Sequence, residues 1–216
     1  MIYVDKTHLI SKIESQISPL FFSRPRRFGK SLLVNTLACL FSRGLSYFHG
    51  LEIEKSWNDT IYQVVRLDFS SLAGRSVSSF KNGLMRRILK NFKIHELDIL
   101  KKYDNPSDLL VDILDDQDNN SLVLLIDEYD APLTHNINRP RKLNEIMDLL
   151  NDFYATIKQY TDKFPLIFIT GITRANHVSI FSSFNNLKDI SLENGYNDLL
   201  GFKYNDLENY FDLHVA

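Results

Sequence analysis

A short basic segment, residues 23–31, has the residue types of a phosphate-binding loop and runs directly into an apolar, helix-like stretch. It ends in Gly29-Lys30-Ser31, the second half of the Walker A pattern G-x-x-x-x-G-K-[ST]. In such a loop, the glycine lets the backbone approach a phosphate, and the following helix N-terminus offers unpaired N–H groups. We expect Lys30 to reach the β- and γ-phosphates of a nucleotide and the Ser31 hydroxyl to ligate Mg²⁺.

The start of this segment departs from the pattern, because Arg24 stands where the first glycine belongs. Arg24, Arg26 and Arg27 could compensate by adding positive charge around the anion, although three bulky side chains also change the shape of the loop. Together with Phe28 they complete the predicted nucleotide-binding segment, residues 24–31. The alternative interpretation is a basic turn that only caps a helix.

A second candidate follows the apolar run at residues 122–126, which ends in Asp127 and Glu128. This is the form of a Walker B element, in which an acid at the end of a buried strand holds Mg²⁺. We expect Asp127 to be that ligand and Glu128 to orient and deprotonate the attacking water. A strand that simply meets solvent at its acidic end is the alternative, but two such motifs in the correct order are harder to obtain by chance.

A third candidate lies after the apolar run at residues 166–169, where Thr170 is a small hydroxyl residue at the end of a predicted strand. In P-loop ATPases with an added strand between the two Walker strands, this position senses the γ-phosphate. Arg174 follows four residues later and could bring positive charge to the transferring phosphoryl group. For both residues a purely structural role, such as a surface arginine, stays open.

The elements that must position these residues alternate along the chain between short apolar strands and amphipathic helices. This alternation predicts an α/β fold, a three-layer sandwich with a mostly parallel central sheet, which binds ligands at the carboxyl ends of its strands. The predicted strands are residues 19–22, 64–69, 122–126, 166–169 and, more weakly, 190–192; the predicted helices are 32–41, 77–88, 106–114 and 143–157.

Composition excludes several classes of protein. The 216 residues carry 25 Lys and Arg against 27 Asp and Glu, so the net charge of −2 gives no reason to expect general binding to nucleic acid. One cysteine cannot form an intrachain disulfide, and no apolar run approaches the roughly 20 residues that cross a bilayer. We therefore expect a cytoplasmic chain without membrane contact. The six histidines are scattered along the sequence without the spacing of metal ligands, so the sequence does not support a zinc site.

Taken together, these motifs resemble the bacterial AAA-ATPase-like family within the P-loop ATPases. The resemblance spans nearly the whole chain and rests on the sequence segments YVDKT at 3–7, SRPRRFGKS at 23–31, LDFS at 67–70, LLIDEYD at 124–130, TGITR at 170–174, SIFS at 179–182 and NNLKDI at 185–190. It implies that arginine at position 24 is usual, and that a modified loop still binds nucleotide. Family members often carry a C-terminal PD-(D/E)XK nuclease-like domain, and no such motif occurs up to Ala216.

The sequence thus predicts one AAA-ATPase-like P-loop domain over residues 1–216, with a C-terminal lid that is cut short. Its expected function is Mg²⁺-dependent binding of ATP with slow hydrolysis that drives a conformational change. One alternative is a nucleotide-gated interaction module that binds ATP without turnover, and another is the ATPase part of a nucleic-acid-processing protein. Besides the nucleotide, a protein partner or self-association is expected.

Overall fold

The centre of the molecule is a parallel β-sheet, seen in a computed structural model that describes residues 4–14, 19–74, 76–95, 99–173, 184 and 186–211. The strands lie in the order β2-β3-β4-β1-β5, and each neighbouring pair is parallel. Their bounds are β1 (Leu20–Ser23), β2 (Gln63–Asp68), β3 (Leu122–Asp127), β4 (Leu166–Gly171) and β5 (Lys188–Asp189). The predicted α/β class with a mostly parallel sheet is confirmed.

Four strands lie where their apolar or alternating runs predict them, but the last one lies two residues before its predicted position. The expected strand at 190–192 is instead a turn after β5. The Asp189 Oδ1 atom accepts the Ser191 N–H at 2.9 Å, which bends the chain away from the sheet, while the Ile190 N–H still donates to the Phe21 carbonyl at 3.0 Å. A local side-chain hydrogen bond therefore ends this strand early.

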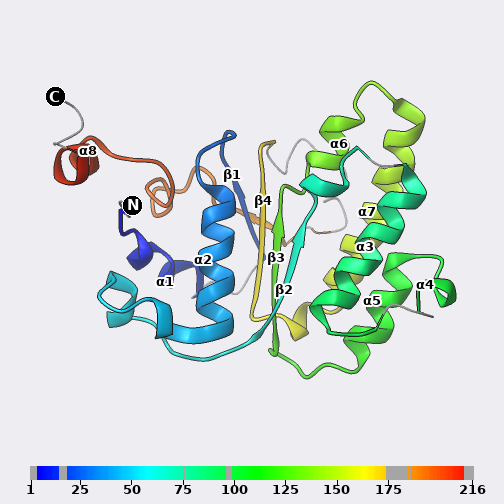
Figure 1. Cartoon of the computed structure of the whole chain (residues 1–216), viewed down its shortest axis with the longest axis horizontal. Helices are drawn as coiled ribbons and strands as arrows, with labels where there is room; N and C mark the ends of the chain where they lie inside the picture. Colours follow the sequence, from blue (N-terminus) through cyan, green and yellow to red (C-terminus); the bar gives the residue numbers. More distant parts are fainter. Residues whose placement is uncertain are drawn as a thin grey trace.

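Helices cover both faces of the sheet. One face carries α2 (Lys30–Arg43) and the short α1 (Ser11–Glu14), and the other carries α3 (Val77–Asn91), α5 (Pro106–Asp115) and α7 (Pro140–Gln159) (Figure 1). The remaining α-helices are α4 (Ile99–Lys102), α6 (Ala131–His135) and α8 (Tyr204–Phe211), and the 3₁₀ turns are η1 (Thr7–Leu9), η2 (Gly44–Tyr47), η3 (Glu52–Lys55), η4 (Ser70–Leu72) and η5 (Thr161–Lys163). Helix α8 lies at the periphery, on the same side as α2.

Helix starts follow ordinary capping chemistry. The Ser76 side chain accepts the Ser79 N–H at the start of α3, and the Asn105 side chain accepts the Ser107 N–H at the start of α5. Pro106 occupies the first turn of α5, where the missing N–H costs nothing. These caps fix where the two helices begin and therefore how they lie on the sheet.

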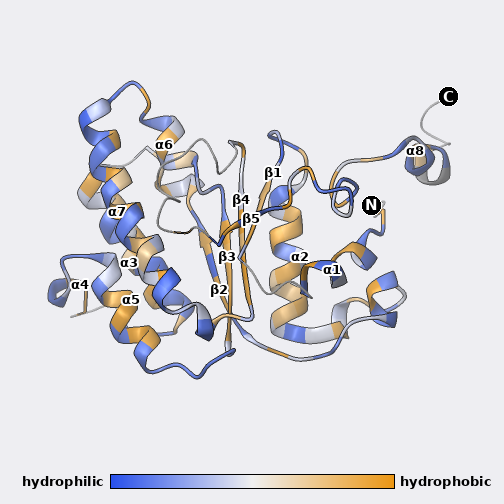
Figure 2. Ribbon diagram, turned by 180° about the vertical axis from the view of Figure 1, so that it is seen from behind, coloured by the Kyte–Doolittle hydropathy of each residue, from blue (hydrophilic) through white to orange (hydrophobic). Residues whose placement is uncertain are grey.

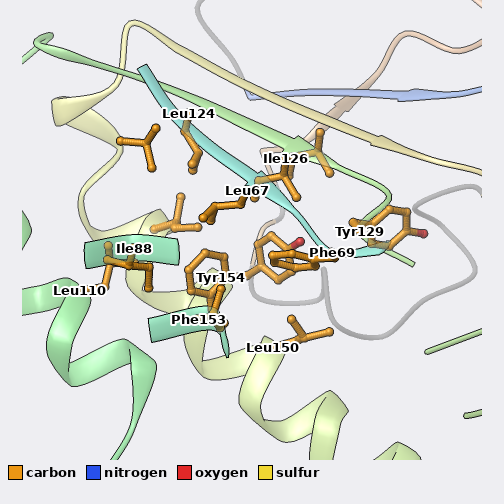
Figure 3. Packing of buried hydrophobic residues seen from close by; sticks show 14 of the residues in the cluster. Leu67, Phe69, Ile88, Leu110, Leu124, Ile126, Tyr129, Leu150, Phe153 and Tyr154 are labelled. Carbon is orange, nitrogen blue, oxygen red and sulfur yellow. The ribbon is translucent and has the colours of Figure 1, made fainter. Parts of the chain in front are cut away.

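Alternating side chains of the strands divide the interior into two cores, one on each face of the sheet. Hydrophobic residues are prominent along the central strands and on α2 (Figure 2). In β3, Leu124 and Ile126 face α3, α5 and α7, whereas Val123 and Leu125 face α2. The first core is rich in aromatic rings and reaches Tyr129, just beyond the end of β3 (Figure 3). This core thus extends to the carboxyl edge of the sheet.

The strand order brings the three candidate segments together. Strand β4 lies between β1 and β3, as expected for a P-loop fold with an added strand between the Walker strands. Ser23 at the end of β1 is level with Gly171 at the end of β4, and Asp127 at the end of β3 is level with Asp68 at the end of β2. Among the described helices, none is both long and apolar enough to span a membrane.

Candidate functional site

The loop between β1 and α2 wraps around the first residue of that helix. Gly29 has φ +89°, in the left-handed region that favours glycine, and Arg27 also has a positive φ of 67°. A Cβ added to Gly29 would lie 3.6 Å from Leu200, an ordinary contact, so the backbone conformation rather than lack of space requires glycine here. Ser31, predicted as a metal ligand, is exposed on the first turn of α2.

Lys30 is the buried cation of this loop, with 5% of its surface exposed. Its Nζ atom donates to the carbonyl oxygens of Arg24 at 2.8 Å and Pro25 at 2.9 Å. Burial lowers the pKa of this ammonium group, while the carboxylates of Glu128 and, more weakly, Asp127 oppose that shift. The lysine predicted to bind phosphates therefore lies within electrostatic reach of the acids at the end of β3.

The three arginines of the loop occupy different environments. The Arg24 guanidinium lies over the Phe22 ring, 4.4 Å from its centroid, and donates to the Ser23 carbonyl and, at 2.6 Å, to the Ser191 carbonyl. It therefore binds the loop to the segment after β5 in this structure. Arg26 and Arg27 are exposed, as is Phe28.

Two residues of the second and third candidates are in direct contact. Asp127 is 2% exposed, and its Oδ1 atom accepts a hydrogen bond of 2.6 Å from the Thr170 hydroxyl, which is fully buried. Strands β3 and β4 are neighbours, so this contact follows from the topology. Arg174, the other candidate on this segment, lies outside the described residues.

Glu128 combines an unusual backbone conformation with a perturbed side chain. Its φ is +52°, a left-handed value that strains a residue with a Cβ. Burial, followed by the nearby carboxylates of Asp127 and Asp68, raises the pKa of Glu128, and the Lys30 ammonium opposes that rise. A carboxyl group with a raised pKa is better suited to accept a proton than an ordinary surface glutamate.

Sequence reasoning did not assign site roles to Asp68 and Asp130, which lie at the same edge of the sheet. The Asp68 carboxylate accepts the Ser70 N–H at 2.8 Å just after β2. Asp130 is 1% exposed and bonds to the loop after β4. Asp68 lies in the segment LDFS and Asp130 in LLIDEYD, and both segments contribute to the family resemblance. This membership is the sequence feature that could have identified the two residues.

A largely apolar cavity of about 600 Å³ opens beside the loop. Three segments that are distant in the sequence line it, within residues 4–10, 27–36 and 199–207, and they include Arg27, Phe28 and Gly29. The Lys6 Nζ atom joins two of these segments, because it donates to the Gly201 carbonyl at 2.7 Å and lies 3.1 Å from an Asp206 oxygen. The cavity thus extends the phosphate-loop candidate toward α8.

The N-terminal segment that lines this cavity is fixed by its own hydrogen bonds. The Asp5 carboxylate accepts the N–H groups of Thr7 at 2.9 Å and Glu52 at 2.7 Å, and the Thr7 hydroxyl oxygen accepts the Ile53 N–H at 3.0 Å. Burial acts to raise the pKa of Asp5, but the hydrogen bonds that its carboxylate accepts from the Glu52 N–H and from the hydroxyl and N–H of Thr7 outweigh burial and lower the pKa. The segment is therefore held on η3 rather than lying loose over the cavity.

The oxygen atoms of the candidate residues are compatible with Mg²⁺ only if waters and a substrate complete its coordination. In the part of the chain that the structure describes, no group of three or more His, Cys, Asp or Glu side chains could hold a metal ion. Mg²⁺ is compatible with this arrangement, because it keeps several waters and uses one or two protein oxygens together with substrate phosphates. The Ser31 hydroxyl and the Asp127 carboxylate are donors of that type.

Comparisons with known proteins bear on this arrangement. A family model described as "Predicted AAA-ATPase" matches residues 1–181. An "Uncharacterized protein in vnfD 5'region" from Azotobacter chroococcum mcd 1 is 31% identical over 211 residues. That similarity covers 97% of this chain and 41% of the relative, so the chain spans less than half the length of that relative.

Proposed function

Since this chain belongs to the predicted AAA-ATPase family, we propose that it binds ATP with Mg²⁺ at the carboxyl edge of its sheet and hydrolyses the nucleotide slowly. Family membership indicates nucleotide binding and the P-loop class of fold, and the resemblance inferred from the sequence is confirmed at that level. The roles of single residues, the metal and the turnover are our proposal. We further propose that hydrolysis changes the conformation of the protein.

The observation that carries this proposal is the position of Lys30. A buried ammonium group at the start of a helix lies near the carboxylates of Glu128 and Asp127 at the end of β3. In a P-loop ATPase, this is where the terminal phosphates of the nucleotide and its cation fit between the positive and the negative partners. The loop of residues 24–29 would then bind the phosphates through its backbone and Lys30.

The metal would be held by Ser31 and Asp127. Bound Mg²⁺ supplies positive charge that offsets the negative charge of the phosphates. The protein contributes the placement of these oxygens: Ser31 is fixed by the first turn of α2, and Asp127 by β3 and by its hydrogen bond from Thr170. The exposed hydroxyl of Ser31 and the buried carboxylate of Asp127 therefore have separate structural supports.

Hydrolysis requires that a water attack the γ-phosphorus and lose a proton, giving ADP and inorganic phosphate. Glu128 is proposed to accept that proton, and its raised pKa suits the task. Thr170 is proposed to sense the γ-phosphate, since its hydroxyl lies at the end of the strand between the two Walker strands. In the present structure that hydroxyl donates to Asp127.

The base and ribose are proposed to occupy the cavity beside Gly29. Its volume of about 600 Å³ lies within the usual range for small-molecule sites, and its lining is largely apolar, as the flat face of a base requires. The cavity is shared by the N-terminal segment, the phosphate loop and residues 199–207. A ligand that touches all three segments would couple nucleotide binding to the position of α8, which supports the proposed conformational change.

Calorimetry with Mg-ATP tests binding. We expect wild type to bind, and Lys30→Ala to lose at least about tenfold in affinity, because a charge-assisted contact to phosphate is removed. Lys101→Ala, which removes an exposed lysine of α4, is the matched control and should bind as wild type does. Absence of binding by wild type, or equal binding by Lys30→Ala and the control, would refute the proposal.

A phosphate-release assay tests turnover separately. We expect Glu128→Gln to bind Mg-ATP with an affinity within a fewfold of wild type. Its rate of phosphate release should be at least about 100-fold lower, because a general base is lost. Equal turnover would remove Glu128 from the role of base. If wild type binds ATP and releases no phosphate, the chain is a nucleotide-gated module rather than an enzyme.

A further inference from the structure

The loops that follow β3 and β4 are joined through the buried carboxylate of Asp130. Its Oδ2 atom accepts three hydrogen bonds, from the Ile172 N–H at 3.0 Å, the Thr173 N–H at 2.8 Å and the Thr173 hydroxyl at 2.7 Å. Asp130 is separated by 42 and 43 residues from these partners. One side chain therefore fixes the backbone directly after the Thr170 strand.

Tyr129 makes a second connection between the same two loops. Its N–H donates to the Thr170 carbonyl at 3.0 Å, and its hydroxyl donates to the Thr173 carbonyl at 3.1 Å. Its ring is fully buried and packs edge-on against Phe21, with centroids 5.4 Å apart. The ring also lies against Gly171, where an added Cβ would come within 2.3 Å of it. The two loops thus form one packed unit.

This unit holds Glu128 in its strained conformation. A left-handed φ at a residue with a Cβ persists only where the surrounding structure enforces it. The residues immediately after Glu128 supply that constraint, because Tyr129 and Asp130 are bonded to the β4 loop and the Ala131 N–H donates to the Glu128 carbonyl at 3.0 Å. The position of Glu128 relative to Thr170 therefore depends on the Tyr129 and Asp130 connections together.

A single oxygen of the Asp130 carboxylate makes these hydrogen bonds. Its other oxygen, Oδ1, is buried and has no hydrogen-bond partner among the described residues. The connection to the loop after β4 therefore requires one acceptor oxygen, which an asparagine side chain also carries.

We propose that Asp130 is a positioning residue that sets Thr170 and the Glu128 backbone so that the site distinguishes ATP from ADP. This inference rests on the proposed function, because it assigns the discrimination to the γ-phosphate that only ATP carries. Asp130 acts through its hydrogen bonds to the Ile172 and Thr173 backbone, and touches neither nucleotide nor metal itself. The affinity for ADP, which lacks the γ-phosphate, is then largely independent of Asp130.

The test is the ratio of the ADP and ATP dissociation constants, each measured by calorimetry with Mg²⁺. We expect Asp130→Ala to lower the preference for ATP by about tenfold or more, because loss of one hydrogen bond to a charged phosphate oxygen changes affinity by about that factor. Its affinity for ADP should stay within about threefold of wild type. Asp130→Asn retains the acceptor and should restore most of the preference, so it also serves if the alanine variant does not fold.

Asn136→Ala is the matched control. Asn136 is fully buried and its side chain donates to the carbonyls of Ala73 and Pro132, so it also connects two loops, outside the proposed site. Its removal should destabilise the fold and leave the ATP preference unchanged. An unchanged preference in Asp130→Ala, an equal loss of ATP and ADP binding, or a wild type without any preference would overturn the inference.

Failure of the proposed function gives a different result, since wild type would then bind neither nucleotide. In that case, hydrogen exchange still tests whether Asp130 holds the backbone of the loop after β4. Asp130→Ala should speed amide exchange at Ile172 and Thr173 and leave Leu125 in β3 protected, whereas unchanged exchange at Ile172 and Thr173 would overturn the positioning role independently of nucleotide.

Discussion

A side chain at position 171 would clash with its neighbours, so replacing Gly171 with alanine should measurably destabilise the protein. It ends β4, level with Ser23 of β1, and has no positive φ that would call for glycine. An added Cβ would lie 2.3 Å from Cε1 and 2.5 Å from Cδ1 of Tyr129, and 3.1 Å from Asp130 Oδ1. Non-bonded carbon atoms prefer about 3.5–4.0 Å, so the ring must move by more than about 1 Å.

Burial and two contacts oppose movement of the Tyr129 ring. It is fully buried, packs against Phe21 and donates through its hydroxyl to the Thr173 carbonyl. Adding a methyl group to such a site costs about 1–3 kcal/mol. For a domain of this size each kcal/mol corresponds to about 2–4 °C, so Gly171→Ala should lower the melting temperature by about 2–12 °C.

Urea unfolding followed by circular dichroism provides the measurement, and a double-mutant cycle assigns the cause. Gly195→Ala is the control, because a Cβ at Gly195 meets no atom within 4 Å and should change stability by no more than about 0.5 kcal/mol. In a Tyr129→Leu background, which lacks the ring edge, Gly171→Ala should cost much less than in wild type. An equal cost in both backgrounds, or a Gly171→Ala variant as stable as the control, would refute the steric explanation.

Three further predictions concern single contacts. Glu128→Gly should leave the free energy of unfolding unchanged or raise it by up to about 1 kcal/mol, because relief of a left-handed strain of about 1–2 kcal/mol exceeds the entropy cost of glycine. The same variant should lose phosphate release. A decrease in stability above about 1 kcal/mol in urea unfolding would contradict the stability prediction. A double-mutant cycle of Lys6→Met and Asp206→Asn should give a coupling of about 0.2–1 kcal/mol. The Lys203 N–H, and then Lys6, lower the pKa of Asp206, so the coupling should be complete above about pH 4 and vanish as the pH falls through that lowered pKa; a coupling unchanged in acid would contradict it. Asn91→Ala should lower the free energy of thermal unfolding by about 1 kcal/mol. The Asn91 side-chain amide accepts the Arg66 N–H at 2.8 Å and donates to the Arg66 carbonyl at 3.0 Å on the edge strand β2. Unchanged stability would mean that water replaces both hydrogen bonds.

The sheet and its main helices could be predicted because they depend on local patterns. Strands β3 and β4 are continuous apolar runs, and they are buried along their whole length between two helical layers. Helix α7 repeats apolar residues at helical spacing and extends three residues before and two beyond its predicted span. In such elements the spacing of apolar residues in the sequence matches the spacing of buried positions in the structure, so the sequence predicts the element.

Contacts between distant segments could not be predicted in this way. Arg24 was expected near a phosphate, yet in this structure it bonds to the Ser191 carbonyl, 167 residues away. Lys6 and Gly201, which are 195 residues apart, meet beside the cavity. Nothing in the local sequence around Asp130 indicates that its partners are residues 172 and 173. These contacts depend on how the segments beyond the strands pack against one another, which no local sequence pattern specifies.

The acids at the carboxyl edge of the sheet divide into two groups by what they bind. Asp68, Asp130 and Asp189 each accept a backbone N–H from a turn beyond the end of a strand, where the sheet no longer pairs that group. Their side-chain oxygens thus stabilise the turns. In the described part of the chain no backbone N–H donates to the side-chain carboxylate of Asp127 or Glu128. The Asp127 carboxylate accepts from the Thr170 hydroxyl, and Glu128 has a strained backbone and a raised pKa. A carboxylate that the fold does not need for a turn remains available to a cation or a water molecule. This difference, rather than acidity at a strand end, distinguishes Asp127 and Glu128 as the residues with which chemistry at this edge would begin.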